Sequence, residues 1–305
     1  MSHFAFQLPI NSPFKPNFFG NRLWLLGCFV VSLFTTGLDV SAQDTDKLTS
    51  GLTFLAGFDG SGNATWASGD QQVYHAKSLD LKDPQPGLPP DVVQLDPQGK
   101  FGGSAKFGKR SEVFTFFRGE KNVAASAEAL DGSVSLWMKL DPQADLEPGY
   151  VDPLQITDKA WNDSCLFLDF TKDEVPRHFR LGVFSDYKYW NPADTGWDNI
   201  AVKERPMIVV EKPTFAADRW THVAFVWSQF NTPKSKAELY VDGKLVGQLV
   251  KPQRFTWNSS KLAIIPGIYY TGGIDELAIW NRSLSAAEIA ELSSDTEGLA
   301  KRLNR

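Results

Sequence analysis

Residues 219–246, with the sequence RWTHVAFVWSQFNTPKSKAELYVDGKLV, carry the clearest structural signal in the chain. Val223, Phe225 and Trp227 recur every second residue, and a period of two is typical of a β-strand rather than a helix. Further along, Asp242-Gly243 separates two apolar runs and favours the positive φ angles of a two-residue type I′ hairpin. The stretch therefore predicts a strand followed by an antiparallel hairpin.

Similar patterns extend outward from this stretch. Residues 133–140 alternate in the same way, and the prolines within residues 80–100 exclude a central strand there and predict a surface loop. Ser285 and Glu288 have the spacing of a capping box and predict one helix near the C-terminus. The 22 Phe and 10 Trp residues suit a β-rich core. Together these features predict an all-β sandwich or jelly roll with few helices.

Composition excludes several functional classes. The chain has 305 residues with a formal net charge of −5, so it lacks the basic surface that nucleic acid or anionic lipid requires. Cys28 lies in the N-terminal apolar run, which leaves Cys165 as the one thiol of the remaining chain, and the histidines show no zinc-ligand spacing. The sequence therefore predicts neither a disulfide framework nor a zinc site.

The N-terminus has the pattern of an export signal. Lys15 and Arg22 precede an apolar run over residues 23–38, and the small residues Val40-Ser41-Ala42 predict cleavage after Ala42. An uncleaved membrane anchor is the alternative, although the run is short for a span. We therefore expect a periplasmic, cell-surface or extracellular protein without stable membrane insertion. Its predicted parts are a signal peptide (1–42), a linker (43–50), a sandwich domain (51–292) and a helical tail (293–305).

Several segments resemble laminin-G-like domains. RWTHVA (219–224) and ELYVDG (238–243) resemble the central "W-x-H-V-A … L-Y-V-D-G" core of that family. GIDELAIWNRSLS (273–285) resembles its closing strand and helix. Two earlier segments, residues 51–59 and 132–137, resemble its first strands. The matches follow the family order, and the middle of the chain also resembles a variant common in exported planctomycete proteins. The resemblance implies a concanavalin-like antiparallel β-sandwich, in a superfamily of lectins and glucanases. Laminin-G-like members often bind carbohydrate or protein and are mostly not enzymes.

The resemblance also implies one structural Ca²⁺ ion. Asp59 matches the family position at the end of the first strand, and Asp275 matches the position in the closing strand. Carboxylates, an amide oxygen and loop carbonyls could supply the six to eight oxygen ligands that calcium needs. The alternative is that Asp59 caps a turn and that Asp275 accepts hydrogen bonds from backbone amides.

An aromatic segment over residues 185–206 is the predicted ligand surface. Flat aromatic faces can stack on sugar rings while neighbouring polar groups bind hydroxyls. The candidate ligand-binding residues are Tyr187, Tyr189, Trp190 and Trp197, joined by Trp161 and Asn162. The alternative is that these rings pack the segment onto the sandwich as a satellite cluster.

Enzymatic hypotheses have weaker support. No Glu-x-Asp-x-Glu run of the concanavalin-like glucanases is present. Arg110, Gln155 and Tyr269 occur in the order of motifs that resemble the jelly-roll polysaccharide lyases of the alginate-lyase type, but Thr157 replaces the histidine base that such chemistry requires. We therefore assign no catalytic residue.

The sequence predicts an exported, monomeric, non-catalytic binding module whose ligand is a glycan. A structural or protein-interaction domain that binds a cell-envelope protein is the first alternative. A polysaccharide lyase is the second, and it requires a cleft in which Arg110, Gln155 and Tyr269 converge.

Overall fold

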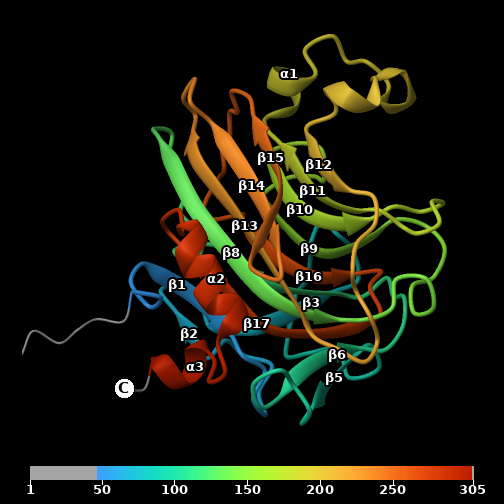
Figure 1. The fold of residues 1–305 in the computed structure, drawn as a ribbon, viewed down its shortest axis with the longest axis vertical. Helices are drawn as coiled ribbons and strands as arrows, with labels where there is room; N and C mark the ends of the chain where they lie inside the picture. The colour runs from blue at the N-terminus through green and yellow to red at the C-terminus, as the bar shows by residue number, and fades with distance from the viewer. Residues whose placement is uncertain (1–46, 304–305) are drawn as a thin grey trace, which may run out of the picture. The chain divides into compact units, whose positions relative to one another are not determined.

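The computed structural model describes residues 47–303, which form two antiparallel β-sheets packed as a sandwich (Figure 1). This confirms the predicted all-β class. The predicted signal peptide (1–42) and residues 43–46 of the predicted linker lie outside the described residues. None of the helices within residues 47–303 is long and apolar enough to cross a membrane.

The first sheet is built around the segment that resembles the family core. Strand β13 (Thr221–Phe230) lies between β8 (Leu130–Lys139) and β14 (Lys236–Val241). Strand β17 (Gly272–Trp280) lies between β8 and β1 (Leu52–Ala56). Strand β6 also pairs with β17, and β5 pairs with β6. In order across the sheet the strands are β15 (Lys244–Val250), β14 (Lys236–Val241), β13 (Thr221–Phe230), β8 (Leu130–Lys139), β17 (Gly272–Trp280), β1 (Leu52–Ala56) and β2 (Trp66–Ala67), with β6 (Ser104–Phe107) and β5 (Val93–Asp96) beside this path.

The second sheet is assembled from the middle of the chain. Its strands are antiparallel throughout. In order they are β12 (Met207–Val210), β11 (Phe179–Phe184), β10 (Cys165–Phe170), β9 (Val151–Thr157), β16 (Ala263–Ile268), β7 (Phe114–Arg118), β3 (Val73–Ala76) and β4 (Gln85–Pro86). The proline-rich region 80–100 contributes only β4 and β5, which lie at the margins of the sheets, so the prediction that it forms no central strand is confirmed.

The main core fills the space between the sheets. Val134, Leu136 and Met138 of β8 are fully buried in it, as the two-residue alternation predicted. Phe54 of β1 meets Phe117 of β7 from the other sheet in a T-shaped contact with ring centroids 4.9 Å apart. Apolar burial on this scale is the main source of the stability of a sandwich.

A second apolar cluster covers the outer face of the first sheet. Helix α2 (Ala286–Ser294) lies across this face (Figure 1), and its Ile289 and Leu292 belong to one buried cluster with Ala224 and Val226 of β13. The predicted capping box is confirmed at Ser285, whose hydroxyl accepts a hydrogen bond from the amide of Glu288. A short helix α3 (Leu299–Arg302) follows within the predicted tail.

The hairpin and the end of the predicted linker show how local and distant contacts fix this sheet. Asp242 and Gly243 have φ angles of 48° and 75°, the positive values that the Asp-Gly dipeptide predicted for the β14–β15 turn.

Leu48 is fully buried, and its carbonyl accepts a hydrogen bond of 2.7 Å from the indole nitrogen of Trp280. Residues 47–50 are therefore packed on the sandwich rather than extended as a free linker.

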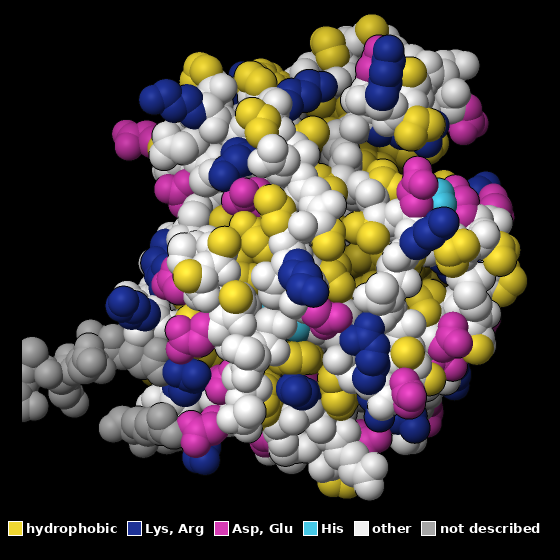
Figure 2. Space-filling model, viewed as in Figure 1, with side chains coloured by type: hydrophobic (Ala, Val, Ile, Leu, Met, Phe, Trp, Pro, Cys, Tyr) yellow, Lys and Arg dark blue, Asp and Glu magenta, His cyan; other side chains and the backbone are white. Residues whose placement is uncertain are grey.

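The segment between β11 and β12 projects beyond the sheets. It contains the one-turn helix α1 (Tyr187–Trp190) and the 3-10 turns η1 (Trp197–Asn199) and η2 (Val202–Glu204). Figure 2 shows that the surface is hollowed below the segment that carries α1 and that hydrophobic side chains gather in the hollow.

Candidate functional site

The outer face of the second sheet carries an open groove with a volume of about 620 Å³. Its floor comes from the strand positions that point away from the core, because Leu154, Leu168 and Leu181 take the inward positions beside them. The floor residues are Asp152, Gln155 and Thr157 of β9, Phe167 and Asp169 of β10, and Arg180 of β11.

An ion pair holds the middle of the floor. Asp169 and Arg180 are direct partners in the register of β10 and β11, and only 3% and 8% of their surfaces are exposed. The Nε atom of Arg180 donates a hydrogen bond of 2.8 Å to Oδ1 of Asp169, and a terminal nitrogen donates to Oδ2. The ring of Tyr150 lies beside the guanidinium group, with its centroid 5.3 Å away. This bidentate, ring-covered pair is a rigid element of the floor.

Asp152 is the second acidic side chain of the floor. The amide group of Gln155, which is 5% exposed, donates a hydrogen bond to its Oδ2 atom. Burial, together with the nearby charge of Asp169, raises the pKa of Asp152 to about 8. At neutral pH this carboxyl group is therefore mainly protonated, and it can donate a hydrogen bond as well as accept one.

Arg110 and Tyr269 form one end of the groove. The guanidinium carbon of Arg110 lies 3.8 Å from the centroid of the Tyr269 ring. One terminal nitrogen of Arg110 also donates hydrogen bonds of 3.4 Å and 3.5 Å to the carbonyl oxygens of Pro148 and Tyr150. The Tyr269 hydroxyl in turn donates to Glu112 at 3.1 Å. These contacts fix the orientation of the guanidinium group at the groove.

Two tryptophans form the other end. Trp161 and Trp197 meet at an angle of 86° with their centroids 5.8 Å apart, and both line the groove. Trp161 is 45% exposed, so a large part of its ring is open to a ligand. Phe184 supports both rings from below, with centroids 5.6 Å from Trp161 and 5.9 Å from Trp197.

The structure divides the other predicted ligand residues between different roles. Trp190 packs edge-on against Phe184, and its indole nitrogen donates a hydrogen bond of 2.9 Å to the carbonyl oxygen of Asn162. Tyr187 packs against Trp190 and donates a hydrogen bond to Asp194. These contacts attach the projecting segment to the sandwich through Trp190, Tyr187 and the carbonyl group of Asn162. This is the packing that the satellite-cluster alternative describes.

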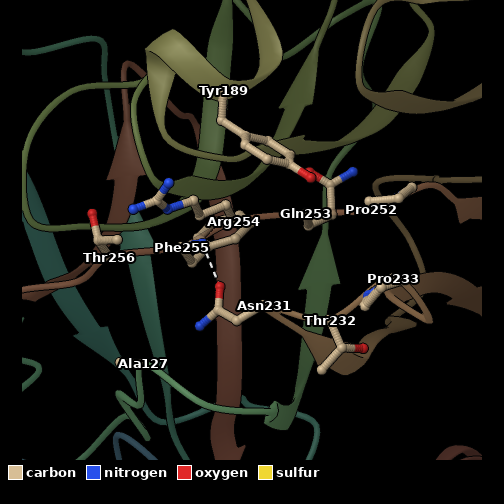
Figure 3. Close-up of a pocket in the computed structure, with 10 residues that line it drawn as sticks. All are labelled: Ala127, Tyr189, Asn231, Thr232, Pro233, Pro252, Gln253, Arg254, Phe255 and Thr256. Carbon is tan, nitrogen blue, oxygen red and sulfur yellow. Dashed lines mark hydrogen bonds between the residues drawn. The ribbon is translucent and has the colours of Figure 1, made fainter.

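Tyr189 belongs to a different depression. It is 46% exposed and lines a pocket of about 510 Å³, and Figure 3 shows its ring above Gln253 and Arg254. Asn231 and Phe255 lie on the other side of this pocket, joined by a hydrogen bond of 2.7 Å from the Phe255 amide (Figure 3). The projecting segment therefore sends Trp197 to the groove and Tyr189 to this separate pocket, and the predicted aromatic surface is not continuous.

The groove also contains the three residues of the lyase hypothesis. Arg110, Gln155 and Tyr269 all line it, which is the convergence that this alternative required. Thr157, at the position where the lyase motif has its base, donates its hydroxyl proton to the carbonyl oxygen of Ala160 at 3.3 Å. A threonine hydroxyl is a poor general base near neutral pH, so the floor lacks the proton acceptor at that position.

The sequence alone did not predict that Asp152, Asp169 and Arg180 lie together. The available signal was an isolated charged residue within each of two otherwise apolar strands, Cys165–Phe170 and Phe179–Phe184. Pairing of neighbouring strands brings these charges together, and residue spacing within one strand carries no information about such a contact.

Asp59 and Asp275, the predicted calcium ligands, hold the same loop. Oδ2 of Asp275 accepts hydrogen bonds from the amides of Lys100 at 2.7 Å and Phe101 at 2.9 Å, and Oδ1 accepts from Glu276 at 2.7 Å. Oδ1 of Asp59 accepts from the amide of Gly103 at 2.6 Å. These N–H groups hold both carboxylates against the loop, and each carboxylate keeps further acceptor sites.

Within residues 47–303 no group of three or more His, Cys, Asp or Glu side chains is placed to hold a metal ion. Calcium binding at Asp59 and Asp275 stays a prediction.

The fold and the groove together define a jelly-roll sandwich with a ligand-sized depression on the outer face of one sheet. The family model of the concanavalin A-like lectin/glucanases superfamily matches residues 118–290, and the chain belongs to this superfamily. No curated protein matches the chain.

Solved structures resemble the fold at low sequence identity. The binding domain of botulinum neurotoxin DC, in complex with rat synaptotagmin II, is 14% identical with a TM-score of 0.53 over 80% of this chain. The binding domain of Paraclostridial Mosquitocidal Protein 1 is 14% identical with a TM-score of 0.52 over 81%. The chain spans 52% of each of these two structures. Domain 4 of an extracellular arabinanase from Geobacillus stearothermophilus, in complex with arabinotriose, is 16% identical with a TM-score of 0.49, over 80% of this chain and 98% of that domain.

Proposed function

We propose that this protein is an exported, monomeric and non-catalytic binding module that holds a saccharide in the groove on the second sheet. The observation that carries the proposal is the position of Trp161 and Trp197, whose rings form one end of a groove with a polar floor. Aromatic faces bind the apolar faces of sugar rings, and hydrogen-bonding side chains select among hydroxyl groups. The groove supplies both kinds of contact in one place.

The arrangement of the floor suits binding better than catalysis. Asp169 is engaged by Arg180 through two hydrogen bonds, and Thr157 stands where a lyase would need a base. Neither group is poised to accept a proton from a substrate near neutral pH. Membership of a superfamily that contains lectins supports the same function, although a fold by itself does not determine activity.

Binding to a glycan array and to insoluble polysaccharides tests the proposal. We expect Trp161→Ala to weaken binding about tenfold, because stacking of one sugar ring on an aromatic side chain contributes on the order of 1 to 2 kcal/mol. Tyr189→Ala is the matched control, since its ring is equally exposed but lies in the separate pocket. Binding that Tyr189→Ala abolishes and Trp161→Ala preserves would refute the groove as the site.

Export is tested separately from binding. When the full chain is expressed in a secretion-competent host, we expect the mature protein to begin at Gln43. N-terminal sequencing of the exported fraction measures this directly. A protein that retains residues 1–42 in the membrane fraction would favour the anchor alternative.

A protein-interaction role is the second candidate, and the edge strand β15 favours it. Within residues 47–303 this strand ends the first sheet, hydrogen-bonded to β14 and lying next to β12 of the second sheet. Its side chains Leu245, Val246 and Val250 are 50%, 39% and 69% exposed. An apolar strand edge can pair with a strand of another protein. Under this alternative, Val250→Lys would abolish binding to a cell-envelope partner, whereas Trp161→Ala would have no effect on it.

A further inference from the structure

We infer that the groove selects saccharides that carry a carboxylate group, the chemistry of uronic-acid polymers, and that Arg110 binds this group. The inference rests on the proposed saccharide function and names its ligand class. It follows from the partners of the charged side chains around the groove.

Most charges that line the groove already have a partner. Asp169 is paired with Arg180 at the floor, as described above. On the rim, Asp80 is paired with Lys82 at 2.6 Å. Lys159 lies 3.4 Å from a carboxylate oxygen of Asp163 and 3.7 Å from one of Asp186. These groups contribute little net charge to a ligand, because each cation and its carboxylate largely cancel at a distance.

Arg110 is different. Within the described part of the chain no carboxylate forms an ion pair with its side chain. The guanidinium group instead contacts the neutral carbonyl oxygens of Pro148 and Tyr150 and the face of Tyr269. Its remaining N–H groups are therefore available, in a planar fork that matches a carboxylate. The ring and the carbonyl contacts reduce the conformational entropy that the side chain would lose on binding.

Asp152 offsets this positive charge less than an ordinary carboxylate would. Burial and the nearby charge of Asp169 raise its pKa to about 8, which favours the neutral form of this floor carboxyl group. In its protonated form it is a donor, and together with the Gln155 amide it offers hydrogen-bond donors to an anionic ligand. Among the described cationic side chains that line the groove, Arg110 is the one without an ion pair, because Lys159 and Arg180 are both paired. The carboxylates of Glu147 and Glu112 lie nearby, but they accept from the Arg110 backbone amide and from the Tyr269 hydroxyl rather than from the guanidinium group.

The experiment compares acidic polymers with neutral polymers of the same linkage. Purified protein is titrated at pH 7 with alginate, polygalacturonate and glucuronan, each beside its carboxyl-reduced form, and with a sulfated galactan. We expect at least one polyuronate to bind about tenfold or more tightly than its reduced form, since a hydrogen-bonded charge pair contributes on the order of 1.5 to 3 kcal/mol. We also expect this advantage to decrease as salt is raised.

Two variants assign the effect to Arg110. Arg110→Gln should lower the affinity for the acidic polymer much more than the affinity for the reduced polymer, so that the ratio of the two affinities falls close to one. Arg110→Lys should retain part of the preference because it keeps the charge without the fork. Lys244→Gln is the matched control, since it removes one exposed positive charge on the β14–β15 hairpin of the other sheet. Thermal melts check that each variant is folded.

The outcomes separate the inference from the proposed function. Equal binding of acidic and reduced polymers, or binding of neutral glycans alone, would overturn the inference and leave the saccharide function intact. Equal binding of the sulfated galactan would overturn selection for a carboxylate. If none of the saccharides binds, on the array or in solution, the proposed function itself is refuted.

Discussion

Arg180 donates two hydrogen bonds to Asp169 from the neighbouring strand, and both side chains are more than nine-tenths buried at the floor of the groove. The pair is thus a structural element of the site as well as a lining of it. A buried charge whose partner is removed is strongly destabilising, because the low-polarity surroundings no longer contain a compensating charge.

Removing Arg180 alone should therefore destabilise the fold. We expect Arg180→Met to lower the free energy of unfolding by about 3 to 5 kcal/mol, and Asp169→Leu in the same chain to restore most of this loss. Urea denaturation measures both. Lys172→Met, which removes an exposed partner of Asp173, should change the free energy of unfolding by less than about 1 kcal/mol. Equal losses of stability in Arg180→Met and Lys172→Met would contradict the structural role of the buried pair.

Trp190 and Trp161 should respond in opposite ways to substitution. Trp190→Ala removes the edge contact with Phe184 and the hydrogen bond to Asn162, so we expect a loss of about 2 to 3 kcal/mol in the free energy of unfolding. Trp161→Ala removes a half-exposed ring and should cost less than about 1 kcal/mol while weakening saccharide binding. Parallel melting curves and binding isotherms distinguish the two roles. A large loss of stability in Trp161→Ala would show that its ring is structural.

The protonation of Asp152 should appear in the pH dependence of stability. Its folded-state pKa of about 8 lies far above the ordinary value of 3.8, so the folded protein holds a proton that the unfolded chain releases between these values. The stabilising contribution is complete below about pH 4 and is lost as the pH rises through about 8.

Comparison with Asp152→Asn isolates this contribution from other titrating groups. At each pH the free energy of unfolding of Asp152→Asn is compared with that of the wild type. We expect the variant to be less destabilised at pH 8.5 than at pH 5, or even more stable than the wild type at pH 8.5, because the amide cannot ionise. Chemical denaturation at the two pH values gives the difference in the free energy of unfolding. A difference that does not change with pH would show that Asp152 titrates normally in the folded protein.

Asp275 should stabilise the loop at residues 99–103 whether or not calcium is present. Asp275→Ala leaves the amides of Lys100, Phe101 and Glu276 without their acceptor, and we expect a loss of about 3 kcal/mol in the free energy of unfolding. Asp59→Ala loses one such bond and should cost about 1 kcal/mol.

Calcium binding is judged from melts of the same proteins in EDTA and in calcium chloride. Similar losses in both solutions would identify the amide contacts as the source of stability. A rise in the wild-type midpoint with calcium that Asp275→Ala abolishes would establish the predicted ion site, since a ligand that binds only the folded state stabilises it by mass action.

The features that sequence predicted most closely are those that neighbouring residues encode. The β14–β15 turn follows from Asp242-Gly243 and the start of α2 from Ser285 and Glu288, while the closing strand at 272–280 was expected from its resemblance to the family. Each depends on backbone conformation or on contacts within a few residues, so no knowledge of strand pairing was required.

The aromatic segment shows where this kind of inference stops. Its composition indicated correctly that rings gather within residues 185–206, yet Trp190 is packed beneath the segment, Trp197 lines the groove and Tyr189 faces another pocket. Sequence records which rings are close along the chain, but the direction in which each ring points depends on the turns of α1 and η1 and on the surface beneath them.

By itself, the sequence determined that this chain is an all-β sandwich of the concanavalin-like type, because two-residue alternation, turn chemistry and family motifs are local properties of the chain. Only the tertiary structure decided what the groove contains. Asp169 and Arg180 are 11 residues apart and meet because β10 and β11 pair in one register, while Arg110 and Tyr269 come from distant segments. A shift of one residue in that pairing would turn the floor side chains of the shifted strand toward the core, so the site depends on the register that core packing selects.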